Sequence, residues 1–372
     1  MAAQGDTAAR ASPQTSAASP RPPGIDTPSN APPIGPDLHE IQLRYKLAPP
    51  TFKTLCTISN SPDRRLVLLK ACQATELRSF PMKQTDRGFF REINDHTAIP
   101  YPIRETISEP WHKAFLLVQI DLQRTGWPNK ISAKARKELL QERSRIYLLL
   151  DRAIRCLVDI FGQRRDGRSV SVALDVLRSI KAGVWEGSEK ELLQVAGVGP
   201  ATMDKLVGAS VKNIKQLSKL EFYHIERLLS RNPPFGHGML RQLASFPVLT
   251  LQLDIVAQYS PTQRPIAGTS ETANPDGPLA IQTSDRPMWI ARVMLGYENE
   301  KTPSWNKKAP WTTLVIEGEG GRLVWFWRGS VKRLADGKEL VVGLGVRKGE
   351  ELRVSFACEE IVGTIIRNTY RA

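Results

Sequence analysis

The hydrophobic pattern of the chain changes once, near residue 248, and this change limits the folds it can adopt. Before that point, apolar residues recur at steps of three and four, which predicts amphipathic helices that face a core. The longest such segment is 132–162, whose stripe consists of Ile146, Leu150, Ala153, Leu157 and Phe161. After that point, short runs rich in Val, Leu and aromatics alternate with glycine turns, which predicts strands. We therefore expect helices followed by an all-β region.

Composition and spacing divide the chain into four parts. Residues 1–36 hold eight prolines and eight alanines, too few large apolar groups to offset the entropy of ordering, and are predicted to be disordered. Residues 37–187 are expected to form a helical bundle around the long helix, and residues 188–247 a second helical unit. Residues 248–372 are expected to form an immunoglobulin-like β-sandwich of about seven strands. A Pro-, Thr- and Ser-rich stretch, 258–287, is predicted to be a mobile insertion.

The charge of the chain favours a polyanionic partner. Its 52 basic residues outnumber its 38 acidic residues, for a formal net charge of +14. Such an excess points to nucleic acid first and to anionic membrane surfaces second, although an inert basic surface stays an alternative. The segment before residue 36 lacks a signal-peptide core, and no window approaches eighteen uninterrupted apolar residues. We expect a soluble, intracellular protein that does not enter a membrane.

Motifs for catalysis are missing from the sequence. It has no phosphate-binding loop, and the glycine-rich string VVGLGVRKG (341–349) lies between two predicted strands, which indicates a hairpin. The five histidines show no metalloprotease spacing, and the four cysteines are far apart, as in a protein from a reducing compartment. We expect this chain alone to be no enzyme and to hold no metal or cofactor.

A glycine-containing hairpin with the helix-hairpin-helix pattern of non-sequence-specific DNA binding is the clearest local candidate for DNA binding. In the string ELLQVAGVGPATMDKLVGASVKNIKQL (191–217), a short helix is expected to end near Ala196 and a second to begin at Pro200. Glycines between them let the backbone approach a phosphate, and the amides of the second helix face outward. The alternative is a hairpin that uses its glycines only for packing. The candidate residues are Gly197, Val198, Gly199, Lys205 and Lys212.

Three arginines of the long helix form the second candidate. Arg145, Arg152 and Arg155 project within about a quarter-turn of one another at 3.6 residues per turn. A row of arginines along a helix can follow the phosphates of a single strand. The alternative is a solvated charged face that pairs with Glu142 and Asp159.

The string RNPPFG (231–236) is expected to act as a structural connection. Pro233 and Pro234 cannot continue the preceding helix and are predicted to force an extended exit. Phe235 can pack back on the helical unit, and Gly236 allows the next turn. We predict a rigid strut between the second helical unit and the β-sandwich.

Taken in order, these features resemble the C-terminal Sec-sixty-three-type homology region of Ski-two-like helicases, in particular the meiotic crossover ATP-dependent DNA helicases. The resemblance covers about residues 40 to 370. Its most specific string is SRNPPFG. The other matching strings are FFREIND (89–95), IPYPIRE (99–105), PWHKAFLLVQIDL (110–122), RAIRCLVDIF (152–161), VW (184–185), VAGVGPATMDKLV (195–207) and WTTLVIEGEG (311–320).

The resemblance implies a nuclear, DNA-directed role in meiotic homologous recombination. In the family, this region follows two motor domains and a winged helix, and its long helix acts as a ratchet on the translocating single strand; Arg152 and Arg155 match that helix. The implied partners are single-stranded or branched DNA, and recombination proteins through the β-sandwich. No motor precedes the match here, so ATP and magnesium are expected only if a motor lies upstream. The low-complexity start favours a fragment of a full helicase with a misplaced first exon, over a motor-less relative.

Two other functions stay open from the sequence. One is a protein-interaction scaffold that docks through the β-sandwich, for which the aromatic run Trp325-Phe326-Trp327 is a candidate surface. The alternative is that this run forms no patch, because strand alternation places Phe326 opposite the two tryptophans and one face is expected to be core. The other is an RNA-directed relative of the spliceosomal helicases. Binding to DNA and RNA single strands of equal length would separate that alternative from the DNA-directed function.

Overall fold

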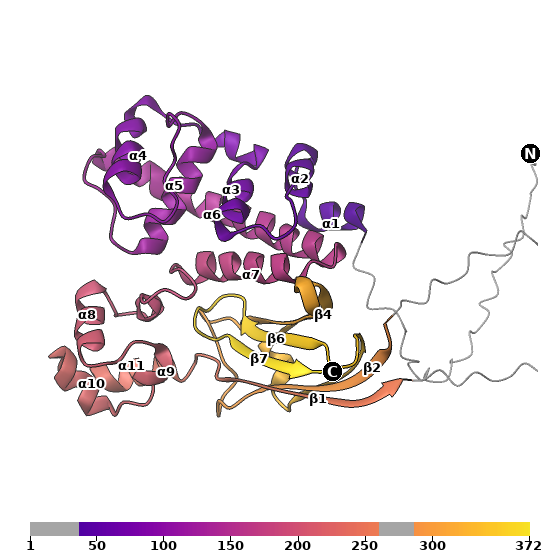
Figure 1. Cartoon of the computed structure of the whole chain (residues 1–372). Coiled ribbons are helices and arrows are strands. Elements are labelled where there is room, and N and C mark those ends of the chain that lie inside the picture. The colour runs from indigo at the N-terminus through magenta and orange to yellow at the C-terminus, as the bar shows by residue number, and fades with distance from the viewer. Residues whose placement is uncertain (1–36, 260–285) are drawn as a thin grey trace, which may run out of the picture.

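A computed structural model describes residues 37–259 and 286–372, and these form helices first and two antiparallel sheets second (Figure 1). The predicted order of helical and β parts is confirmed. The predicted disordered segment 1–36 lies outside the described residues, as does nearly all of the predicted insertion 258–287. The strand that precedes that insertion runs to Tyr259, one residue past its expected start. No helix in the described part is both long and apolar enough to cross a bilayer.

The helical bundle is built around two long antiparallel neighbours, α6 and α7. The side chain of Ser132 accepts a hydrogen bond from the backbone N–H of Ala135 at the start of α6, and Asp166 caps α7 in the same way. Gly183, with a φ of 71°, ends α7. The helices of the bundle are α1 (Leu38–Tyr45), α2 (Pro49–Cys56), α3 (Arg64–Cys72), α4 (Gln84–His96), α5 (Pro110–Gln123), α6 (Ala133–Gln163) and α7 (Gly167–Ala182).

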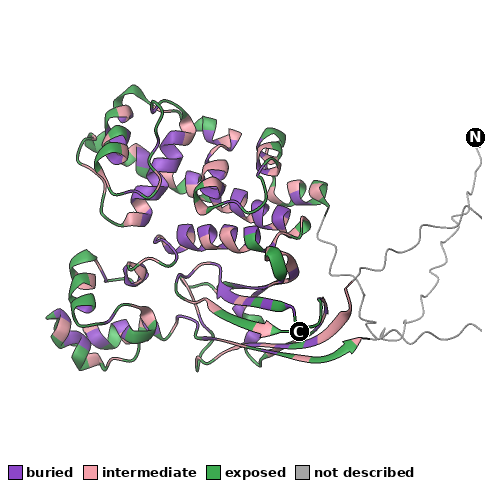
Figure 2. Cartoon of the chain, in the orientation of Figure 1, coloured by how far each residue is buried: buried purple, intermediate pink, exposed green. Residues whose placement is uncertain are grey.

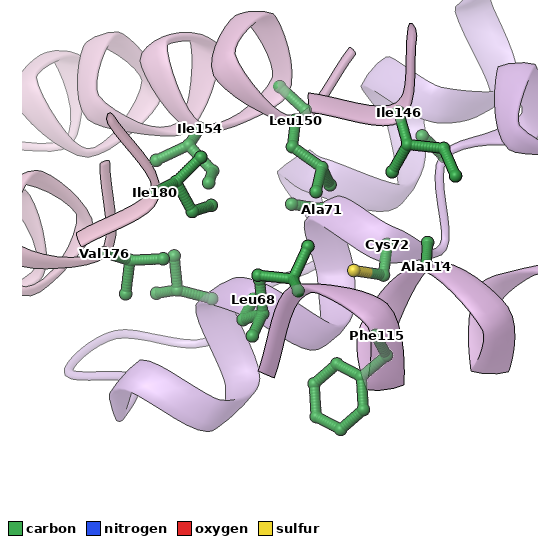
Figure 3. Close-up of a cluster of buried hydrophobic side chains, with 14 of the residues drawn as sticks. Leu68, Ala71, Cys72, Ala114, Phe115, Ile146, Leu150, Ile154, Val176 and Ile180 are labelled. Carbon is green, nitrogen blue, oxygen red and sulfur yellow. The ribbon is translucent and has the colours of Figure 1, made fainter. Parts of the chain in front are cut away.

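The core of the bundle lies where α3, α5, α6 and α7 meet. Figure 3 shows Leu68 and Cys72 of α3 beside Phe115 of α5, with Ile154 of α6 and Val176 of α7 lining the same space. The predicted stripe of α6 is buried here along its whole length. Its burial holds the opposite face of α6 toward solvent.

The second unit consists of short helices. A single 3₁₀ turn, η2 (Glu191–Gln194), leads through the glycine turn into α8 (Pro200–Gly208). The unit continues with α9 (Ile214–Leu217), α10 (Phe222–Leu229) and α11 (Phe235–Leu243). The start of α8 at Pro200 agrees with the prediction. The element before the turn is shorter than predicted, since it ends at Gln194 and is not an α-helix.

The predicted strut is wrong. Helix α10 ends at Leu229, with Ser230 in a left-handed conformation, and α11 begins at Phe235, directly after Pro234, and packs back against α10. Gly236 makes this packing possible, because a Cβ there would lie 2.2 Å from the carbonyl oxygen of Phe222. Its N–H donates to Oε1 of Glu226 at 2.9 Å. The string therefore forms a tight helix–helix turn, and the connection to the β region follows α11.

The β region has two antiparallel sheets that enclose one core. The first has the order β1-β2-β5, with β1 (Leu249–Tyr259), β2 (Met288–Tyr297) and β5 (Lys338–Gly345). The second has the order β4-β3-β6-β7, with β3 (Trp311–Glu317), β4 (Leu323–Ser330), β6 (Glu351–Cys358) and β7 (Ile366–Arg371). Alternate residues of both sheets, such as Val293 and Phe356, share the same buried cluster.

Strand β3 connects the two parts of the molecule, because it is buried on both faces. Leu314 and Ile316 belong to the core between the sheets, whereas Val315 belongs to the core of the bundle. Helix α7 lies over this face of the sheet (Figures 1 and 2). The core of the sandwich also includes residues of α8, α10 and α11, among them Leu206 and Met239. Both helical parts are thus packed on the β region.

The aromatic run of β4 is not an exposed surface. Trp325 and Trp327 pack against the core between the sheets, and Phe326 packs against the core of the bundle. All three side chains are half-buried. The structure agrees with the alternation of the strand, which places Phe326 opposite the two tryptophans, and the run does not form an exposed docking face.

Candidate nucleic-acid interface

A stripe of basic side chains follows the solvent face of α6. Arg145 and the exposed Leu148 mark its middle, and at 3.6 residues per turn Lys134, Lys137 and Arg152 fall within a quarter-turn of them. Arg152 is half-buried and the other cations are exposed. From Lys134 to Arg152 the stripe is about 27 Å long at 1.5 Å per residue.

The acidic residues of α6 do not neutralise this stripe. Each of them pairs with a cation on another element. These pairs are Glu138 with Lys83 (2.6 Å), Glu142 with Lys113 (2.5 Å), Asp151 with Lys181 (3.0 Å) and Asp159 with Arg44 (3.1 Å). No carboxylate in the described part of the chain lies within 4.0 Å of the cations of Lys134, Lys137, Arg145 or Arg152. The alternative that Glu142 and Asp159 neutralise the arginines is therefore wrong.

Arg155 has a different position from its two predicted companions. Its guanidinium contacts Asp151 at 3.2 Å, Glu359 at 2.5 Å and Glu360 at 3.8 Å, and only 17% of its side chain is exposed. It connects α6 to the turn that follows β6. The prediction that Arg155 belongs to an open row of arginines is wrong, because Asp151 of the same helix and two carboxylates of the β region already surround it.

The carboxylates around Arg155 differ in their surroundings. Glu359 is fully buried and also pairs with Arg328 at 2.6 Å. Glu360 accepts the backbone N–H of Trp311 at 2.9 Å. Burial, together with the neighbouring charge of Glu359, raises the pKa of Glu360 to about 7.

The glycine turn of the second unit has a defined geometry. Gly197 adopts a φ of 85°, a left-handed conformation that glycine tolerates best, and Gly199 is the N-cap of α8. Val198 between them is buried in the core, which anchors the turn. A Cβ at either glycine would meet no described atom within 4 Å, so neither glycine is needed for packing. The alternative that the glycines serve close packing is not supported.

The second unit carries four exposed lysines. Lys205 of α8 and Lys212 before α9 are exposed, and so are Lys215 and Lys219. Within the described ranges none of these four ammonium groups has a carboxylate within 4.0 Å. Together with the amides at the start of α8, they form a positive surface.

A basic cleft of about 460 Å³ separates the bundle from the second unit. Arg143 and Tyr147 of α6 line one side, and Ala196 of the glycine turn lies on the other. Arg124, at the end of α5, donates from Nε to the carbonyl of Gly183 at 2.8 Å and so supports the wall. The other cations of the lining are Lys181 and Lys307. The cleft thus has basic residues on several of its elements.

Comparison with known proteins assigns the chain to a family. The family model described as the Sec63 Brl domain matches residues 37–364, which is most of the chain. The chain belongs to the Sec63 Brl domain family.

Curated relatives of this Sec63 Brl chain are helicases. It is 21% identical over 299 residues to the ATP-dependent DNA helicase MER3 of Saccharomyces cerevisiae, covering 77% of the chain and 23% of that relative. It is 22% identical over 220 residues to the probable ATP-dependent DNA helicase HFM1 of Mus musculus, covering 58% of the chain and 15% of that relative. The chain thus spans less than a quarter of the length of these relatives.

Several basic residues of the interface were not predicted from the sequence. Lys134 and Lys137 continue the three- and four-residue spacing of the arginines, and extending the stripe toward the start of α6 would have found them. Arg124 and Lys307 come from loops at the edge of the cleft. No local pattern relates those two residues, because the fold alone brings them together.

Proposed function

We propose that this Sec63 Brl chain binds single-stranded DNA along α6 and at the glycine turn, as a non-catalytic accessory region of a MER3- or HFM1-like helicase. The observation that carries the proposal is the stripe formed by Lys134, Lys137, Arg145 and Arg152, which pairs with no carboxylate among residues 37–259 and 286–372. A helix whose carboxylates are all engaged elsewhere leaves these cations available for phosphates.

The finer features of the proposal have separate support. A helix-hairpin-helix assignment for the second unit is supported by the left-handed Gly197, the N-cap at Gly199 and the exposed lysines of the unit. An immunoglobulin-like assignment for the β region is supported by its seven described strands in sheets of three and four. A role in meiotic recombination, and with it a nuclear location, rests on the similarity to MER3 and HFM1.

Salt-dependent binding of a fluorescent oligothymidine tests the proposal. We compare the chain with the double variant Arg145→Ala, Arg152→Ala over a range of salt concentrations. Loss of two phosphate contacts is expected to lower the slope of log K against log salt by about 1.4, since each contact to a single strand contributes about 0.7. The matched control is Arg292→Ala, Arg333→Ala, which removes two exposed charges from the β region.

Three results would contradict the proposal. They are the absence of binding, binding that does not respond to salt, and equal losses in the stripe variant and the control. An oligouridine of the same length, bound more tightly than the oligothymidine, would favour an RNA-directed function instead.

A further inference from the structure

A groove between α7 and the second sheet lies apart from the α6 stripe and the glycine turn. It measures about 330 Å³. Leu174 and Asp175 of α7 form one wall, and the outer faces of β3, β6 and β7 form the floor. This size is at the lower end of the range for small-ligand pockets, about 300–1,000 Å³.

A buried hydroxyl in this groove lacks a partner. Thr313 of β3 is 1% exposed, lines the groove, and its Oγ1 makes no hydrogen bond to any described residue. The neighbouring Thr312 faces the other side of the sheet, and its hydroxyl donates to the carbonyl of Gly329 at 2.9 Å. Buried polar groups are nearly always satisfied, so the Thr313 hydroxyl points to a ligand that completes it.

The charges around the groove favour an anionic ligand. Asp175 is engaged by Arg64 and Arg178, each at 2.7 Å, and Glu317 accepts a hydrogen bond from Ser171. The arginines at the mouth are less engaged. Arg353 is 3.6 Å from Glu351 with 75% of its side chain exposed, and Arg367 is 3.8 Å from Asp175 with 61% exposed. Asp175 is thus neutralised by two arginines and Glu317 is hydrogen-bonded by a hydroxyl, whereas the outer cations are available.

Strand β7 borders the groove and is an edge of its sheet. It pairs with β6 on one side, and within the described residues 366–371 the backbone makes no hydrogen bond to any other element. An edge strand of this kind can accept an extended peptide as an additional strand. Arg367 and Thr369, which share one face of the strand, line the groove, as does Asn368 between them.

We propose that this groove binds an extended acidic segment of a partner protein. The segment lies along β7 with its carboxylates at Arg353 and Arg367, a short aliphatic side chain on Leu174, Val315 and Ala357, and one polar group at the Thr313 hydroxyl. Nucleic acid fits this groove less well, because the described lining contains no aromatic side chain for base stacking.

Peptide binding to the full chain tests this proposal. The probe is a fluorescein-labelled octapeptide of alternating valine and glutamate, and its counterpart replaces glutamate with lysine. We expect the acidic peptide to bind at least tenfold more tightly than the basic one. The double variant Arg353→Glu, Arg367→Glu is expected to lower the affinity for the acidic peptide at least tenfold. The control double variant Arg292→Glu, Arg333→Glu makes the same change in net charge and is expected to leave this affinity unchanged.

Thr313→Val provides a second test that a structural role cannot mimic. Removal of an unsatisfied hydroxyl is expected to keep or raise the melting temperature of the chain. It is also expected to lower the affinity for the acidic peptide about fivefold. Equal binding of the two peptides, or equal losses in the groove and control variants, would overturn the proposal. So would binding of an oligothymidine, but not of the peptide, through Arg353 and Arg367. None of these outcomes depends on Arg145 or Arg152, so the DNA proposal stands or fails separately.

Discussion

Nη1 of Arg155 lies 2.5 Å from Oε2 of Glu359, across 204 positions of sequence. This ion pair connects the middle of α6 to the turn between β6 and β7. Glu359 is fully buried, and Arg328 of β4 is its second cation. The long helix of the bundle is therefore fixed to the β region by a charge pair as well as by apolar packing.

Arg155→Ala is expected to destabilise the whole chain. Removal of one partner leaves a buried carboxylate with fewer counter-charges, at a cost of about 3 kcal/mol. We expect a lower melting temperature for this variant in thermal unfolding. Arg145→Ala, an exposed change on the same helix, should alter stability by no more than about 0.5 kcal/mol. Equal melting temperatures for the two variants would contradict the structural role of Arg155.

Stability is expected to depend on pH through Glu360. Its pKa is raised to about 7 in the folded protein by burial and by Glu359, while Arg155 and Lys181 act in the opposite direction. A carboxyl with a raised folded-state pKa favours folding below its unfolded pKa, and this contribution is lost as pH rises through about 7. Glu360→Gln should therefore raise the melting temperature at pH 8 and leave it unchanged at pH 4. An equal rise in melting temperature at pH 4 and pH 8 would show that Glu360 does not titrate between these two pH values.

Gly236→Ala tests the turn between α10 and α11. The added Cβ would lie 2.2 Å from the Phe222 carbonyl oxygen, so the helices must separate, at a cost of about 2 kcal/mol or more. Gly238 is the matched control on the same helix, because a Cβ there meets nothing within 4 Å. Gly238→Ala is expected to stabilise the chain by about 0.5–1 kcal/mol. Chemical unfolding measures the free energy of unfolding of both variants. An equal decrease in the two variants would contradict the close contact between Gly236 and the Phe222 carbonyl.

The two glycines of the turn before α8 are expected to respond differently. Gly197→Ala places a side chain at a φ of 85° and should cost about 1 kcal/mol in stability. Gly199 has a φ of −98° and open space around it, so Gly199→Ala adds no backbone strain and should cost only about 0.5 kcal/mol, because alanine is a poorer N-cap than glycine. If a phosphate approaches this backbone as proposed, Gly199→Ala should still weaken oligothymidine binding. Unchanged binding would remove the turn from the DNA interface.

Much of the helical part could be predicted from local sequence. The segment 132–162 was expected as a helix and α6 spans Ala133–Gln163, because its apolar period is regular and Ser132 caps it. The helix α11 was missed because FGHGMLRQL contains two poor helix formers. Its formation depends on packing of Met239 and Leu243 in the core, which a local pattern does not show.

The interface was predictable only where it follows a single helix. Arg145 and Arg152 lie on the solvent face that their spacing indicated, but the same spacing also selected Arg155. Helical period gives the direction of a side chain and carries no information on a carboxylate 204 residues away. The groove beside β7 was missed for the same reason, since α7 and three strands contribute to it.

Strand β3 also determines how this chain can be divided in the laboratory. Val315 completes the core of the bundle, and Phe326 of β4 packs on the same cluster. A fragment that stops before residue 248 would keep α6 and its basic stripe but expose the apolar flank of α7 to water. Such a fragment is expected to self-associate, and its binding to any partner would include non-specific contacts through this exposed apolar surface. Point substitutions in the intact chain are therefore the sound way to separate DNA binding from protein binding.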